Sequence, residues 1–158
     1  MRIEFSKLIK EAIRLELNVS ELYLVFHASF KEDMNFWWTL AIEEKNHAAL
    51  LKNLESFATH LSEIPLPKEE VSASELREIN LRLEKLIPQY KKSPPSREEA
   101  LKLAYSLETS AGESHFQKFA DEESDSKISK IFKQLNQSDV NHARRIKDYA
   151  EAHDMRIQ

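Results

Sequence analysis

The chain has 158 residues, of which 41% are hydrophobic and 32% are charged, and its formal net charge is −4. This balance predicts one soluble globular domain over residues 1–158 and leaves no broad cationic surface for nucleic acid or acidic lipid. Cysteine is absent, which excludes disulfides, thiolate catalysis and cysteine-based iron or zinc sites within the chain. No segment approaches the about 18 apolar residues of a membrane span, and residues 1–5 carry charges too early for a signal peptide, so a cytoplasmic location is expected.

Residues that form tight turns are almost absent, because the chain holds one glycine and five prolines. The prolines occur only at Pro65, Pro67, Pro88, Pro94 and Pro95. Since hairpins and barrels need frequent turn residues, this composition predicts an all-α fold built from long helices.

The first predicted helix covers residues 4–31. Its apolar residues recur at steps of three and four, and Glu16 interrupts the inner stripe that they form. The stripe consists of Leu8, Ile9, Ala12, Ile13, Val19, Tyr23, Phe26 and Phe30. The following turn is so short that the first two helices should be antiparallel neighbours, and Asp33 is expected to cap the second.

The second predicted helix covers residues 33–62. Glu44 and His47 lie on its inner stripe one turn apart, where both groups are costly to bury unless they are paired or hold a metal. The stripe consists of Met34, Trp37, Ala41, Ala48, Leu51, Leu54, Ala58 and Leu61. Trp38 and Ile42 lie on a second face and are expected to pack against a further helix or a partner subunit.

Residues 64–95 are predicted to form a long connection that contains one shorter amphipathic helix at residues 73–87. Ser72 and Glu75 have the pattern of a capping box at its start, and Pro88 is expected to end it. A connection of this length lets the next helix begin at the far end of the fold, which makes it a crossover rather than a hairpin.

Two further long helices are predicted, at residues 96–122 and 126–153. Ser96 and Glu99 have the capping-box pattern at the start of the first of these. Its inner stripe holds Ala100, Ala104, Leu107, Ala111, His115 and Phe119, and that of the last helix holds Ile128, Ile131, Phe132, Leu135, Ala143, Ile146 and Tyr149.

Each of the four long helices carries an acid on its inner stripe. In the second and fourth a histidine follows the acid by three residues, a spacing at which one helix face offers an oxygen and a nitrogen to the same ion. Four carboxylates in one buried layer would repel one another, and metal charge is the natural compensation. Four carboxylates and two imidazoles can hold two divalent metals. The predicted ligands are Glu16, Glu44, His47, Glu108, Asp139 and His142.

The pattern of these residues resembles the ferritin-like di-iron carboxylate proteins and, among them, the rubrerythrin-type domain. It comprises Glu16 with Tyr23 seven residues later, residues 44–48 (Glu-Lys-Asn-His-Ala), Leu107-Glu108 followed by Phe119-Ala120, and residues 139–143 (Asp-Val-Asn-His-Ala). The resemblance implies a ferritin-like four-helix bundle with a long crossover, containing an extra short helix, between the second and third bundle helices.

The resemblance also implies a role for each ligand. Glu16 and Glu108 would be terminal ligands, Glu44 and Asp139 would bridge two metal ions, and each metal would take one imidazole. Iron is the expected metal, with manganese and zinc as alternatives, because this set of nitrogen and oxygen ligands suits all three. The chain differs from the family at Asp139, where Glu is usual, and at Ala111, where rubrerythrins have a further Glu.

The function that the resemblance implies is that of an oxidoreductase reacting with peroxide or dioxygen in oxidative-stress defence, as a homodimer. Since the sequence contains no rubredoxin module, an external electron donor is expected. Two other hypotheses stay open. One is an iron-handling ferroxidase or storage subunit, which requires a closed cage, and the other is a non-enzymatic metal-sensing or metal-binding helical module.

Other polar residues are weaker candidates. Tyr23 and His115 are candidates for positions around the metals, with core packing as the alternative for each. His27 faces inward in this pattern but lies three turns from the acid of the first helix, too far to share the metals. Glu21 and Glu43 lie off the stripes and are expected to be solvated.

Overall fold

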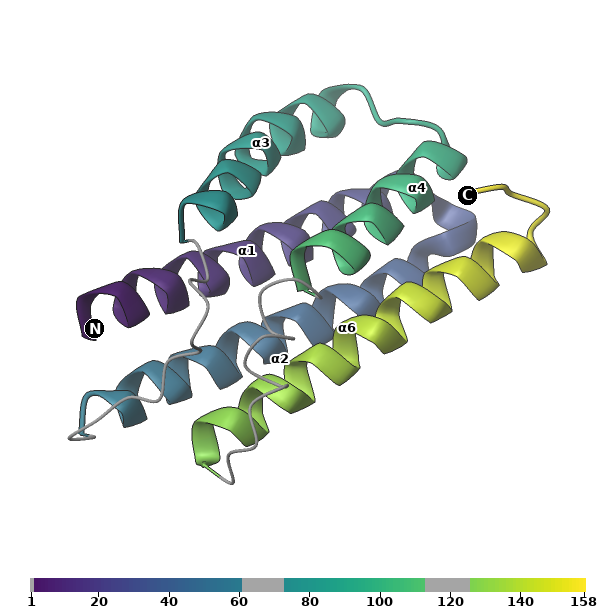
Figure 1. Ribbon diagram of the computed structural model, residues 1–158. Helices are drawn as coiled ribbons and strands as arrows, with labels where there is room; N and C mark the ends of the chain where they lie inside the picture. The colour runs from purple at the N-terminus through teal and green to yellow at the C-terminus, as the bar shows by residue number, and fades with distance from the viewer. Residues whose placement is uncertain (1, 61–72, 113–125) are drawn as a thin grey trace.

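The computed structural model describes residues 2–60, 73–112 and 126–158, and every regular element in these ranges is helical, as the sequence predicts (Figure 1). The short element η1 is a 3₁₀ turn and η2 is a turn of π-helix. No helix in the described ranges has the length and apolar character needed to cross a membrane. The elements are α1 (Arg2–Ser29), η1 (Lys31–Asp33), α2 (Met34–Ala58), α3 (Ala73–Lys92), α4 (Arg97–Leu107), η2 (Glu108–Gly112) and α6 (Lys127–Ala152).

The helices lie side by side along a common direction (Figure 1). α1 and α2 form the predicted antiparallel pair, α6 lies against α2 and α4, and α3 packs on α1. Arg97, the first residue of α4, forms an ion pair with Asp33 directly before α2, with 2.7 Å between guanidinium and carboxylate. α2 and α4 therefore begin at the same end of the molecule and run in the same direction.

The predicted inner stripes form the core. Nearly all of their described residues are buried, and Tyr23, Phe26, Trp37 and Phe132 are among the largest side chains enclosed. Met34 is an exception with 43% exposure, because it is the first residue of α2 and lies beside the turn. Leu61, predicted to extend the stripe of the second helix, lies outside the described residues.

Helix α3 is fixed on α1 by a polar contact that the residue pattern does not predict. Asn80 is fully buried, and its amide nitrogen donates to the backbone oxygen and the carboxylate of Glu11, at 3.0 and 2.9 Å. Asn18 donates to the amide oxygen of Asn80 at 3.0 Å. These bonds fix how α3 lies against α1 and satisfy a polar group that would otherwise destabilise the interface.

Helix α3 continues past Pro88, which the sequence predicts to end it, and reaches Lys92. Proline removes one helical hydrogen bond. The turn that follows is anchored on α1, however: the Tyr90 ring lies 6.0 Å from the Phe26 ring, and Lys91 Nζ lies 2.6 Å from Glu21 Oε1. These tertiary contacts offset the lost bond. Ser72 of the predicted capping box lies outside the described residues.

The prediction that Asp33 caps the second helix is wrong. With φ −106° and ψ 7°, Asp33 lacks the extended backbone of a capping residue, and its side chain makes no cap hydrogen bond. Its carboxylate instead accepts two hydrogen bonds from Arg97, at 2.8 and 2.7 Å, and one from the Tyr149 hydroxyl at 2.7 Å. A bidentate guanidinium pair is stronger than a neutral cap.

Helices α4 and α6 each begin with a serine cap, of which the sequence predicts the first. Ser96 Oγ accepts from the Glu99 amide at 3.2 Å and Glu99 Oε2 accepts from the Ser96 amide at 2.9 Å, which confirms the capping box of α4. Ser126 caps α6 by accepting from the Ser129 amide at 3.1 Å.

The third long helix is predicted to run unbroken to residue 122, but α4 ends at Leu107 and a π turn begins at Glu108. The hydroxyls of Thr109 and Ser110 donate to the backbone oxygens four residues earlier, at 2.8 and 2.5 Å, and so compete with the amides of a regular helix. Such turns are frequent at functional sites. Residues 113–122, including His115 and Phe119, lie outside the described ranges.

Trp38 is 50% exposed and α3 packs on α1, so the predicted contact of Trp38 with a partner subunit stays a prediction. His27 differs from its predicted environment. His27 does not face the core: its Nδ1 lies 2.8 Å from the backbone oxygen of Met34 near the α1–α2 turn, and its ring contacts Trp38. Ile42 is half-buried.

Candidate metal centre

The six predicted ligands lie together in the interior. Glu16 comes from α1, Glu44 and His47 from α2, Glu108 from the start of η2, and Asp139 and His142 from α6. The helical period places each of them on an inner stripe, and the packing of α1, α2 and α6 brings the stripes together. All four carboxylates and His142 are buried, and the His47 side chain is 12% exposed. These six residues are called the centre below.

Two groups within the centre have the separations of metal ligands. One comprises Glu44, His47 and His142, and the other comprises Glu108, Asp139 and His142; in each group the ligand atoms lie within 4.8 Å of one another. The two imidazole rings are nearly parallel, with centroids 5.4 Å apart. Glu16 adjoins the first group, because its Oε2 lies 3.5 Å from His47 Nδ1.

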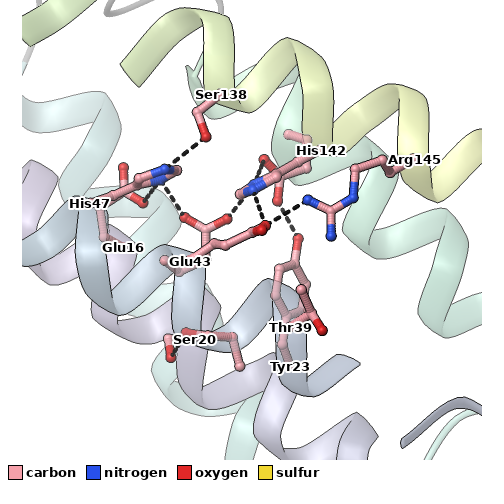
Figure 2. A network of polar contacts seen from close by, with 12 residues as sticks. Glu16, Ser20, Tyr23, Thr39, Glu43, His47, Ser138, His142 and Arg145 are labelled. Carbon is pink, nitrogen blue, oxygen red and sulfur yellow. Dashed lines mark hydrogen bonds and ion pairs between the residues drawn. The ribbon is translucent and has the colours of Figure 1, made fainter. Parts of the chain in front are cut away.

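His47 presents one nitrogen to the centre and the other to α6 (Figure 2). Its Nδ1 lies 3.0 Å from Glu44 Oε2, and its Nε2 lies 2.8 Å from the Ser138 hydroxyl. The serine thus fixes the ring orientation from outside, as an outer hydrogen-bond partner does for a metal-bound histidine.

His142 has the same arrangement with stronger partners. Its Nδ1 lies 2.7 Å from Glu44 Oε1 and 3.5 Å from Glu108 Oε2, while its Nε2 lies 2.8 Å from Glu43 Oε2. Arg145 Nη1 donates to the same Glu43 oxygen at 2.6 Å (Figure 2). Glu43, which the sequence predicts to be solvated, keeps 36% exposure, but α6 also supplies an imidazole and a guanidinium to its carboxylate.

Tyr23 lies against the centre rather than serving the core by packing alone. Its hydroxyl donates to Glu108 Oε1 at 2.5 Å, and the residue is fully buried. Burial and the nearby carboxylate of Glu108 raise the pKa of Tyr23 well above its ordinary value. The phenol therefore stays protonated and serves as a donor. His115, the other residue expected around the metals, lies outside the described residues.

Burial raises the pKa of three carboxyl groups in the centre. Burial and then repulsion by Glu44 raise the pKa of Glu16 well above its ordinary value, and bring the pKa of Glu108 to about 7. Burial and then repulsion by Glu108 raise the pKa of Asp139 strongly. Glu44 differs: burial alone would raise its pKa, but close contacts with Glu16 and both imidazoles hold it well below its ordinary value.

The imidazoles balance these acids. Burial alone would lower the pKa of His47, but Glu16 and Glu44 raise it to about 10. In the same way, Glu108 and Glu44 outweigh burial and raise the pKa of His142 to about 11. Without a metal, the centre at neutral pH therefore retains protons on both imidazoles and on buried carboxyl groups. A divalent cation would replace these protons.

Two atoms of the centre test directly whether a cation fits. Glu44 Oε1 and His142 Nδ1 are buried and 2.7 Å apart, yet within the described part of the chain neither makes a hydrogen bond of acceptable geometry. The contact of His142 Nε2 with Glu43 holds a proton on that nitrogen, so a metal that displaces the other proton would find the lone pair of Nδ1 beside Glu44. An imidazole nitrogen and a carboxylate oxygen this close in a buried site suit a divalent metal that replaces the proton between them.

Comparisons of the chain with protein-family models, with curated proteins and with solved structures found no match. The centre is therefore interpreted from its own geometry and chemistry. Its donor set is rich in oxygen, includes two nitrogens and has no sulfur, which suits iron, manganese or zinc.

Proposed function

We propose that this chain is a ferritin-like protein with a dinuclear metal centre, and that it works as a non-haem di-iron oxidoreductase on peroxide or dioxygen. The observation that carries the proposal is a pair of buried atoms, Glu44 Oε1 and His142 Nδ1. They face each other among carboxylates from four elements, and the described residues give them no hydrogen bond of acceptable geometry. A buried layer of acids is stable when cations compensate it.

The arrangement of the helices supports a four-helix bundle with a long crossover. α1, α2, α6 and the α4–η2 segment supply the centre, and α3 packs outside them on α1. Since α2 and α4 start at the same end, where Asp33 pairs with Arg97, the chain between them has to return along the length of the molecule. That is the connection of ferritin-like bundles.

The residues of the centre divide the work of holding two metals. His47 and His142 each offer Nδ1 to one metal, Glu44 lies between them with one oxygen toward each imidazole, and Glu16 and Glu108 lie at the two sides. Asp139 belongs to the group of Glu108. We propose iron as the metal, with manganese and zinc as alternatives.

The bound metals would supply the electron transfer to the oxidant, and the protein supplies orientation and a dry environment. Ser138 and Glu43 hold the two imidazole rings from outside. The Tyr23 hydroxyl donates a hydrogen bond to Glu108 within the apolar interior. An external donor returns the electrons.

Metal titration tests the proposal. Metal-free protein titrated with Fe(II) under anaerobic conditions should saturate near two ions per chain, and a charge-transfer absorption should appear when peroxide is added. The double variant Glu44→Ala/His47→Ala should lose this binding. The matched control Glu21→Ala/His27→Ala, which removes the same residue types at partly exposed positions, should keep it. The assignment would be refuted if the Glu44→Ala/His47→Ala variant still bound two Fe(II) ions, or if the unmodified chain bound none.

Two measurements separate this function from the alternatives. Mass in solution distinguishes the expected homodimer from a storage protein, because only a closed cage of many subunits encloses a mineral. Turnover of peroxide with an added electron donor distinguishes an oxidoreductase from a metal-binding module, which would take up metal without turnover.

A further inference from the structure

A series of aromatic rings begins at the centre. Tyr23 donates its hydroxyl hydrogen to Glu108, and its ring centroid lies 5.4 Å from that of Trp37. Trp37 in turn lies 5.2 Å from Phe36, its neighbour on α2. Tyr23 and Trp37 are buried, with Trp37 only 1% exposed. The rings are close enough for an electron to pass between neighbours.

The series continues outward on α6. Phe36 and Tyr149 are stacked, with centroids 3.9 Å apart and planes at 14°. Tyr149 is half-buried and stacks on His153, at 4.2 Å, which is exposed near the C-terminal end of the chain. Rings from α1, α2 and α6 thus link a buried metal ligand to the solvent.

Both tyrosines of the series donate to a carboxylate. Tyr23 lies 2.5 Å from Glu108 Oε1, and Tyr149 lies 2.7 Å from Asp33 Oδ1. A phenol that loses an electron becomes a strong acid, so an acceptor already in hydrogen-bond contact lets the proton leave with the electron. Each tyrosine is therefore placed for reversible one-electron oxidation.

Trp37 lacks such an acceptor. Its Nε1 is buried and has no hydrogen-bond partner among the described residues, an arrangement that costs about 1–3 kcal/mol in an apolar interior. Unsatisfied buried groups of this kind call for an explanation, and a redox role is one. An indole that keeps its proton when oxidised remains a strong oxidant. It passes the charge to a neighbouring tyrosine instead of retaining it.

We propose that Tyr23, Trp37 and Tyr149, with Phe36 as a bridging ring, form a one-electron relay between the centre and a surface site at His153. The proposal rests on the proposed function, because the relay has a purpose only if an oxidised metal arises beside Glu108. The electron source is a small water-soluble one-electron reductant, for which ascorbate is the probe.

The electrons and protons balance in each step. Tyr23 gives one electron to the oxidised metal ion and its phenol proton to Glu108. Trp37 then gives an electron to Tyr23, which regains its proton from Glu108. Tyr149 gives an electron to Trp37 and its proton to Asp33. Ascorbate reduces the Tyr149 radical, and the proton returns. One electron has moved from ascorbate to the metal.

The relay can be tested in the metal-free protein with light. Because the chain contains no cysteine, His153→Cys gives a unique position for a ruthenium polypyridyl photo-oxidant. A flash with an added quencher makes the label an oxidant beside Tyr149. Phenoxyl radicals are then followed by transient absorption and, after freezing, by electron paramagnetic resonance. Tyr23→Phe and Tyr149→Phe each remove one hydroxyl and identify which radical gives which signal.

The expected result is a radical component that disappears in Tyr23→Phe, although Tyr23 is buried and remote from the label in sequence. Trp37→Phe and Phe36→Leu should each reduce this Tyr23 component severalfold and leave the Tyr149 component in place. The matched controls Trp38→Phe and Tyr90→Phe, which alter aromatic rings outside the series, should change neither. Circular dichroism checks that each variant is folded.

Two results would overturn the relay. One is the absence of a Tyr23 component in the labelled protein, and the other is a Tyr23 component that both Trp37→Phe and Phe36→Leu leave unchanged. Tyr149→Phe, which keeps the ring stacking but removes the hydroxyl that pairs with Asp33, supplies a second test, because it should lower the Tyr23 component if Tyr149 is a station of the relay. These outcomes do not depend on metal. If Fe(II) uptake fails and the radical transfer succeeds, the proposed function fails and the relay stands as a property of the chain.

Discussion

Two buried acid clusters of this protein are neutralised in different ways. In the Asp33 cluster (Asp33, Arg97 and Tyr149), burial alone would raise the pKa of Asp33, but the guanidinium and the phenol outweigh burial and lower it. The partners that the described residues give the acids of the centre are imidazoles, Tyr23 and other carboxyl groups, and burial raises the pKa of Glu16, Asp139 and Glu108.

The difference separates a structural ion pair from a site that needs a ligand. Asp33 has a fixed cation and a hydrogen bond to each oxygen, so the fold itself satisfies it. The centre retains protons that a cation could replace, and within the described residues Glu44 Oε1 and His142 Nδ1 face each other without a hydrogen bond of acceptable geometry. Metal should therefore affect the stability of the centre and leave the Asp33 cluster unchanged.

The largest expected effect is stabilisation by metal. A ligand present at one hundred times its dissociation constant stabilises the folded state by about 2.7 kcal/mol per site, so two filled sites would add about 5 kcal/mol. For a chain of this size that raises the melting temperature by about 10–20 °C. Thermal melts with and without Zn(II), which does not undergo redox chemistry, measure the shift. Arg97→Ala should show the same shift, because Arg97 lies outside the centre. A melting temperature that does not change with metal would mean that the centre, like the Asp33 cluster, needs no ligand.

The second effect is the loss of the Asp33 pair. Arg97→Ala leaves a buried carboxylate with Tyr149 alone, and should destabilise the fold by about 2–3 kcal/mol, at or below the range for a fully buried pair because Arg97 is one-third exposed. Urea unfolding of the metal-free protein measures it. The control Lys102→Ala removes an exposed pair with Glu98 and should cost no more than about 0.5 kcal/mol. Equal losses in both variants would show that burial of Asp33 adds nothing.

The comparison also indicates what the sequence could predict. Glu16, Glu44 and Asp139 were found because the helical period alone determines which side chains share a buried face. The antiparallel α1–α2 pair followed from the short turn between the helices, and the Ser96–Glu99 capping box from a local pattern. Each of these features depends on residues a few positions apart.

The features that the sequence did not predict depend on distant partners. The helix pattern of α2 places Glu43 off the buried stripe and does not predict its partners. These are His142 and Arg145, about 100 residues later in the chain. Asp33 has the residue type of a cap, but Arg97, 64 residues away, provides a stronger partner. Pro88 ends a helix in isolation, whereas contacts with α1 carry α3 beyond it. No local pattern contains that information.

A third, smaller effect concerns Glu43, which contacts the ligand His142 from outside the centre. Glu43→Gln weakens the charge-assisted contact that orients His142 and should lower metal affinity about 10–100-fold, the usual cost of losing such a partner. Competition with a chromophoric chelator measures the affinity. The control Glu21→Gln alters an acid paired with Lys91 at the surface and should change nothing. An unchanged affinity in Glu43→Gln would mean that His142 is held by the core alone.

The smallest effects concern the pH dependence of the metal-free protein, where the two clusters should have opposite signs. The folded pKa of Asp33 lies below its ordinary value of 3.8. Its ionised form therefore stabilises the fold above that pH, and the contribution is lost as pH falls through the folded pKa. The folded pKa of Asp139 lies above the same ordinary value, so its contribution is unfavourable at neutral pH and disappears in acid.

Two isosteric variants make that contrast measurable by urea unfolding across the acid range. Asp33→Asn should be less stable than the unmodified chain near pH 7, with the difference narrowing below pH 3.8. Asp139→Asn should be more stable near pH 7 without metal, because an amide has no proton to lose, and the gain should shrink below pH 3.8. With Zn(II) present, Asp139→Asn should instead be less stable than the unmodified chain, since Asp139 then contributes a ligand that Asn does not replace. If Asp139→Asn, like Asp33→Asn, were less stable than the unmodified chain near pH 7 without metal, the protein itself would already compensate the acids of the centre.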